Sequence, residues 1–170
     1  MRTGYNYFYF LIFILLFASV SSSLAVNGKF KLRTAIKERL PKKIAWIEPG
    51  VTEKDEVLKK LGKPDKAEKS FFYNISGLDY DTTISFKNDK VAYIFHSPIQ
   101  TIAFSEFQKL LPEEQTKKTD PKVISEQPLH ERGRVFNVTV EAEGVLIRVS
   151  NTKLKMVESF TLWQPGKKAP

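Results

Sequence analysis

The sequence predicts an α+β protein in which an antiparallel sheet carries short helices on one face. Two observations lead to this fold class. Residues 82–95 and 134–162 alternate apolar and polar side chains and return across short turns, which is typical of antiparallel strands. Shorter segments with helical spacing, at 52–61 and 102–111, come before them. Since an antiparallel sheet can bury one face and expose the other, we expect the helices to cover a single face.

The helix expected at 52–61 has well-defined ends. Thr52 is expected to cap its N-terminus through the side-chain oxygen, and acidic residues follow in the first turn. Gly62 is expected to adopt a positive φ and so to end the helix. Val57, Leu58 and Leu61 fall on one side of the helix, which predicts that this side is buried.

The first expected hairpin has an inward row of side chains. Ile84 and Phe86 lead into a turn at Asn88-Asp89, two residue types that tolerate positive φ. The returning strand is expected to point three side chains the same way: Val91, Tyr93 and Phe95. The side chains expected inside the fold as a whole are Val57, Leu61, Ile84, Phe86, Val91, Phe107, Val138, Ile147 and Val149.

One stretch around this helix resembles a known family. The strings are Pro49-Gly50-Val51-Thr52, Val57-Leu58 and Leu61-Gly62-Lys63-Pro64-Asp65. They are similar to the start of the SmpA/OmlA-type domain, found in the small lipoprotein of the outer-membrane β-barrel assembly machinery. Over residues 45–97 the resemblance implies one or two helices followed by a three-stranded antiparallel sheet. It also implies a role in envelope assembly, although this chain has no Cys to acylate and continues beyond one such domain.

The C-terminal half shows a second helix-plus-sheet pattern, which leaves two interpretations open. With a constant shift of 63 residues, two sets of hairpin residues align: Ile84, Phe86, Asn88, Lys90, Val91 and Ile94 with Ile147, Val149, Asn151, Lys153, Leu154 and Val157. The first interpretation is a tandem repeat, 45–98 and 99–165, whose layout resembles that of β-lactamase-inhibitor proteins. The second is one domain over 45–165 in which two amphipathic hairpins align by coincidence. Residues 112–134 are expected to form a long polar loop, either for binding or as a connector.

Residues 1–25 are expected to be a targeting segment. Arg2 precedes an apolar run from Tyr5 to Val20, and Ser23 and Ala25 supply the small side chains that a signal peptidase reads. This order predicts a signal peptide and an exported protein, either periplasmic or secreted. Because the basic residues follow the apolar run, an uncleaved membrane anchor is the alternative.

Residues 26–44 are expected to form a basic amphipathic arm. Between 26 and 43 there are seven Lys or Arg and one Glu, whereas residues 44–170 carry 19 basic and 18 acidic side chains. This distribution argues against nucleic-acid binding by the domain. The residues expected to contact an anionic membrane surface are Lys29, Lys31, Arg33, Lys37, Arg39, Lys42 and Lys43. Leu32, Ile36 and Leu40 share one helix face, and would either dip into that surface or pack on the domain.

No catalytic group, metal site or cofactor is expected. The chain has no Cys, and neither His96 nor His130 belongs to a metal-binding pattern. Glu141 and Glu143 are expected to be a solvated pair near a turn. The sequence therefore predicts a non-catalytic protein-binding or assembly module of the cell envelope. The alternative is a secreted or periplasmic inhibitor or effector that binds a target protein through a sheet surface.

Overall fold

The computed structural model describes residues 30–120, 135–150, 152 and 154–170. The chain divides into two compact units, Met1–Lys31 and Leu32–Pro170, and the second contains the sheet and its core. The targeting segment expected at 1–25 and the basic residue Lys29 lie outside the described residues. Within those residues, no helix combines the length and apolar character that crossing a membrane requires.

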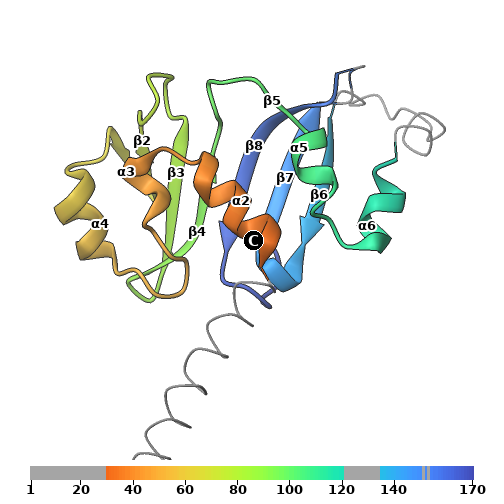
Figure 1. The fold of residues 1–170 in the computed structure, drawn as a ribbon. Helices are drawn as coiled ribbons and strands as arrows, with labels where there is room; N and C mark the ends of the chain where they lie inside the picture. Colours follow the sequence, from red (N-terminus) through yellow and green to blue (C-terminus); the bar gives the residue numbers. More distant parts are fainter. Residues whose placement is uncertain (1–29, 121–134, 151, 153) are drawn as a thin grey trace, which may run out of the picture. The chain divides into compact units, whose positions relative to one another are not determined.

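An antiparallel sheet forms the centre of the second unit (Figure 1). Its strands are β1 (Lys66–Ala67), β2 (Ser70–Tyr73), β3 (Thr82–Lys87), β4 (Lys90–His96), β5 (Ile102–Ala103), β6 (Val135–Val140), β7 (Val145–Ser150) and β8 (Met156–Trp163). Their order is β1-β2-β3-β4-β8-β7-β6, with β5 paired to β8. Every pairing is antiparallel, which confirms the α+β class.

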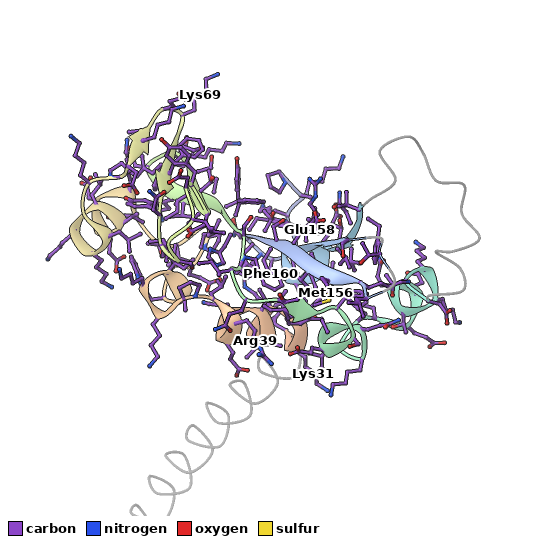
Figure 2. The ribbon with its side chains drawn as sticks, turned by 90° about the horizontal axis from the view of Figure 1, so that it is seen from above. Lys31, Arg39, Lys69, Met156, Glu158 and Phe160 are labelled. Carbon is purple, nitrogen blue, oxygen red and sulfur yellow. The ribbon has the colours of Figure 1, made fainter. Side chains whose placement is uncertain are left out.

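Short helices lie on one face of this sheet, as expected (Figures 1 and 2). They are α2 (Lys31–Arg39), α3 (Lys42–Ala45), α4 (Lys54–Leu61), α5 (Ser105–Gln108) and α6 (Glu113–Lys118), and the 3₁₀ turn η1 (Glu141–Glu143) joins β6 to β7. On β8, Phe160 points toward the helices and Glu158 points away from them (Figure 2). Phe107 of α5 packs edge-to-face on Phe160 with ring centroids 5.5 Å apart, which ties helix to sheet.

The core fills the space between the helices and this face. Leu32, Ile36 and Ile44 contribute from α2 and α3, and Ile84 and Ile147 contribute from the sheet, all fully buried. Of the nine side chains expected inside, seven are buried, while Leu61 and Phe86 are half-buried and pack at its edge.

Two β-bulges change which side chains face the core. Ser85 pairs with Tyr93, but Phe86 pairs with Val91, so β4 has one extra residue between them. Val91 and Ile94, three residues apart, are therefore both buried. The expectation that Tyr93 and Phe95 point inward with Val91 is wrong, because strict alternation fails at a bulge. In the same way, β8 has an extra residue between the partners of Arg148 and Val149.

The local signals at turns are partly confirmed. Asn88 and Asp89 both have positive φ, 52° and 57°, and Gly62 follows α4 with a φ of 81°. The capping role expected of Thr52 is wrong. Its hydroxyl instead accepts a hydrogen bond from the backbone N–H of Glu48 at 2.8 Å, and α4 begins two residues later.

The helix expected at 102–111 is shorter in the structure. Ile102 and Ala103 form β5, paired with β8, and only Ser105–Gln108 is α-helical. The polar segment expected at 112–134 begins with α6, and residues 121–134 lie outside the described residues. The hairpins β3–β4 and β7–β8 adjoin within one sheet through the β4–β8 pairing, and the tandem repeat stays a prediction.

Helix α2 is fastened to the sheet by the side chain of Arg33, which is only 5% exposed. Its Nη1 lies within hydrogen-bonding distance of three backbone carbonyl oxygens: Glu143 (3.1 Å), Gly144 (3.1 Å) and Trp163 (2.8 Å). Its Nη2 donates to the carboxylate of Glu48 at 2.6 Å. The backbone N–H of Arg33 donates to the Glu143 carboxylate at 2.7 Å, which pairs one of the N–H groups left open at the start of the helix. Arg33 therefore joins α2, η1, the end of β8 and the loop before α4.

Replacing Arg33 with Met should lower the free energy of unfolding by about 3 kcal/mol, because Glu48 and the three carbonyls lose their shared donor. Arg33→Lys should lower it by less, since an ammonium cannot reproduce the planar fork of the guanidinium. Urea unfolding followed by Trp fluorescence measures both changes. Lys37→Met is the control and should cost less than about 1 kcal/mol, because the Lys37–Glu48 pair is partly exposed. Equal unfolding midpoints for Arg33→Met and the unaltered chain would contradict this role.

Candidate functional site

The structure separates the seven basic residues that were expected to contact an anionic surface. Arg33 is buried, so its expected membrane contact is wrong. Lys37 pairs with Glu48 at 2.6 Å, and Arg39 pairs with Glu106 at 2.6 Å. Lys31, Lys42 and Lys43 are exposed, and Lys29 is outside the described part of the chain.

The apolar stripe of the expected arm packs inside the protein. Leu32 and Ile36 are fully buried and Leu40 is 6% exposed, all within the core cluster. The alternative in which these side chains pack on the domain is therefore correct, and they are not available to a membrane. The domain boundary expected at residue 45 falls inside the packed unit, because α2 and α3 supply part of its core.

Two acidic residues, Glu143 and Glu48, bind the basic side chains and backbone of α2. Glu143, expected to be solvated, is 7% exposed and binds the backbone N–H of Arg33. For Glu48, burial by itself would raise the pKa of the carboxyl. The hydrogen bond from Lys37 and the charge and hydrogen bond of Arg33 outweigh burial, so the pKa of Glu48 lies below its ordinary value of 4.5.

A buried polar cluster lies at the opposite end of β4. The Asp81 carboxylate accepts hydrogen bonds from the backbone N–H groups of Ile75 (3.0 Å) and Ser76 (2.6 Å) and from the hydroxyl of Thr82 (2.7 Å). Thr82 Oγ1 also lies 2.9 Å from Nδ1 of His96. Because the Thr82 hydroxyl has one proton and gives it to Asp81, this geometry assigns the neutral His96 proton to Nδ1. His96 thus acts as a structural donor, in agreement with the structural role expected from its place at a strand end.

His96 also borders a cavity of about 360 Å³, lined by Arg39, Pro41, Ser76, His96, Pro98, Ile99, Gln100 and Ile102. The His96 side chain is 2% exposed, so it presents little surface to that cavity. Burial lowers the pKa of His96, and the charge and backbone hydrogen bond of Asp81 oppose this only in part. Within the described residues, no group of three or more His, Asp or Glu side chains is placed to hold a metal ion.

The sheet face away from the helices carries an uncharged row of side chains. The strand register places them directly opposite one another from β2 to β6: Phe72, Thr83, Phe95, Thr161, Leu146 and Thr139. All six are half-buried. We call this set the open-face row. The paired charges Arg148 and Glu158, 3.3 Å apart, lie beside it.

A basic cleft of about 550 Å³ lies where β4 begins and β8 ends. Its lining residues are Gly50, Lys87, Asn88, Lys90, Val91, Ala92, Tyr93, Trp163, Gln164, Lys167, Lys168 and Pro170. These lysines belong to none of the sites predicted from the sequence. Two flank a hairpin turn and two lie near the end of the chain, and the pairing of Tyr93 with Trp163 brings the two segments together.

The lowered pKa of His96 makes stability depend on pH. The unfolded chain takes up a proton near pH 6.5, whereas the folded chain resists it, so stability falls as the pH drops below about 6.5. Unfolding free energies compared at about pH 7 and about pH 5.5 should show this loss. In His96→Asn, which keeps a donor toward Thr82 but cannot titrate, the loss should be smaller, while His130→Asn should retain it. A pH dependence unchanged in His96→Asn would contradict the assignment.

Comparison with known proteins gives one structural similarity. No protein-family model matches the chain, and no curated protein matches its sequence. A solved structure of a DUF4309 family protein, YjgB from Bacillus subtilis, is similar with a TM-score of 0.41 and 14% sequence identity. The match covers 81% of this chain and 94% of that chain.

Proposed function

We propose that this protein is a non-catalytic protein-binding module of the cell envelope, and that the open-face row is its contact surface. The observation that carries the proposal is the row itself. Six side chains from six neighbouring strands form one uncharged line on the face without helices. The partner we propose is an envelope protein with a flat, mainly apolar contact face.

The composition of the row suits protein recognition. Phe72, Phe95 and Leu146 supply apolar area, and three threonines between them supply hydroxyl groups that can donate and accept hydrogen bonds. Aromatic residues are enriched and charges are depleted in the centres of protein interfaces. The core of the sheet holds these side chains from behind, so binding would cost little conformational entropy.

The non-catalytic part of the proposal rests on where the titratable groups are used. Glu143 and Glu48 hold Arg33, and Asp81 holds the loop before β3 together with Thr82 and His96. Each of these groups already has a structural partner. The envelope location rests on the targeting segment expected at 1–25, and the assembly role rests on the SmpA/OmlA resemblance over 45–97.

A secreted or periplasmic inhibitor or effector is the second candidate, and it would use the same sheet face. It is supported by a correspondence between the hairpins. The bulge in β3–β4 falls between Ser85 and Phe86, and the bulge in β7–β8 falls between Arg148 and Val149, again 63 residues later. This favours the tandem layout on which the candidate rests. Fractionation separates the two, since an inhibitor of external targets would be found in the culture medium and an envelope module would stay with the cells.

A charge placed in the open-face row should abolish partner binding. Phe95 lies near the middle of the row, so Phe95→Glu should reduce crosslinked recovery of a specific envelope protein by about 30-fold, the loss typical of a central interface residue. The measurement is quantitative crosslinking in cells that express the full chain at native levels. Leu154→Glu is the matched control, because Leu154 is 76% exposed and lies outside the row.

Two measurements make the outcome decisive. Thermal unfolding of both variants should match the unaltered chain within a few degrees, which shows that the sheet is intact. Recovery that falls equally in Phe95→Glu and Leu154→Glu, or in neither, would refute binding through this face.

A further inference from the structure

We propose that the basic cleft binds the phosphate groups of an anionic membrane surface. The cleft lies at one end of the sheet, and its lysines come from two segments: Lys87 and Lys90 around the β3–β4 turn, and Lys167 and Lys168 after β8. Tyr93 and Trp163 lie between the two segments as a cross-strand pair. No residue of the open-face row lines this cleft, and the inference does not depend on the protein-binding proposal.

The cleft gathers four lysine side chains and no acidic side chain. None of its four lysines forms an ion pair with another described residue, and no Asp or Glu side chain is among its lining residues. Elsewhere, Lys37, Lys60, Lys66 and Lys117 each have a carboxylate partner. Lys87 and Lys90 also lie directly opposite each other in the strand register, an arrangement of like charges that destabilises a hairpin. A bound anion would relieve this repulsion.

The two C-terminal lysines are held in place by backbone contacts. Trp163 Nε1 donates to the carbonyl of Lys167 at 2.7 Å, and the N–H of Gly166 donates to the carbonyl of Glu141 at 2.9 Å. The segment therefore bends back over Trp163, with Lys167 and Lys168 at the rim of the cleft. Trp163 itself is only 2% exposed, so its ring fixes this segment, and the half-buried Tyr93 is the aromatic side chain of the cleft that can meet lipid headgroups.

Lys90 of the cleft lies close to acidic side chains outside the cleft. Lys90 also borders a neighbouring recess lined by Glu53, Asp55 and Asp89. These carboxylates reduce the positive field on that side of the turn. We therefore expect Lys87, Lys167 and Lys168 to contribute more to binding than Lys90.

The position of α2, where the chain enters the domain, supports a membrane as the source of the phosphates. Arg33, in the first turns of α2, contacts the carbonyl of Trp163, so α2 begins at the same end of the sheet as the cleft. The apolar run of the expected targeting segment ends at Val20, and ten residues of extended chain span at most about 35 Å. If that segment occupies a membrane, even transiently, the cleft end of the domain is held within reach of the headgroups.

Vesicle co-sedimentation tests this proposal. The protein is the chain from residue 26, which keeps every core residue that the structure describes, Leu32 being the first of them. It should bind vesicles that contain phosphatidylglycerol, bind neutral phosphatidylcholine vesicles weakly, and be released by salt. Replacing Lys87, Lys90, Lys167 and Lys168 with Gln should reduce binding roughly fivefold per lysine, and so by roughly 100-fold or more in total.

Matched variants separate this site from the alternatives. Lys59, Lys63, Lys69 and Lys109 are exposed lysines elsewhere, and replacing these four with Gln should have little effect. An equal loss of vesicle binding in both quadruple variants would overturn the proposal, because binding would then depend only on the net charge of the protein. A loss of vesicle binding found only in the triple variant Lys31→Gln, Lys42→Gln, Lys43→Gln would overturn the proposal and indicate that the N-terminal helices bind the membrane. Binding to soluble poly-glutamate as tight as binding to the vesicles would overturn it in favour of an acidic protein.

Discussion

The burial of one guanidinium group determines how the helices meet the sheet. Arg33 contacts carbonyl oxygens on η1, at the start of β7 and at the end of β8, and it also holds Glu48 in the loop before α4. These groups come from three segments, Glu143-Gly144, Trp163 and Glu48, which are separated in sequence. A buried guanidinium is stable only when its N–H groups are paired, so the segments must stay together for the helix to pack. Leu32 and Ile36 of the same helix then fill the core beneath.

Because the helices occupy one face, the other face is available for contact. Side chains alternate across a strand, so each buried residue of β2, β3, β4, β6, β7 and β8 has neighbours on the open side. Among those neighbours, a line of phenylalanine, leucine and threonine crosses six strands, with the charged pair Arg148 and Glu158 beside it. The same packing that makes the core therefore also supports a firm, uncharged surface, as a recognition surface requires.

The positive charge of the chain is used in two different ways. In the N-terminal helices, Arg33, Lys37 and Arg39 have carboxylate partners, and Arg33 is buried with its charge inside the fold. At the opposite surface of the β4–β8 pair, four lysines share a cleft without partners in the described protein. The net charge of residues 44–170 is nearly zero, and this sum does not show where the lysines gather. The electrostatic potential at the cleft depends on the distances to the nearby charges and not on the sum over the sequence.

Local chemistry in the sequence determined the α+β class, the turn at Asn88-Asp89, the end of α4 at Gly62 and most of the buried side chains, since each depends on neighbours a few residues away. Only the tertiary structure decided the rest. The bulge that turns Tyr93 and Phe95 to the open face arises from the pairing of β3 with β4, which alternation along one strand cannot reveal. The burial of Arg33 requires carbonyls more than 100 residues away, so in sequence it was indistinguishable from its exposed basic neighbours. The cleft exists because β4 pairs with β8, and no local pattern encodes which strands become neighbours.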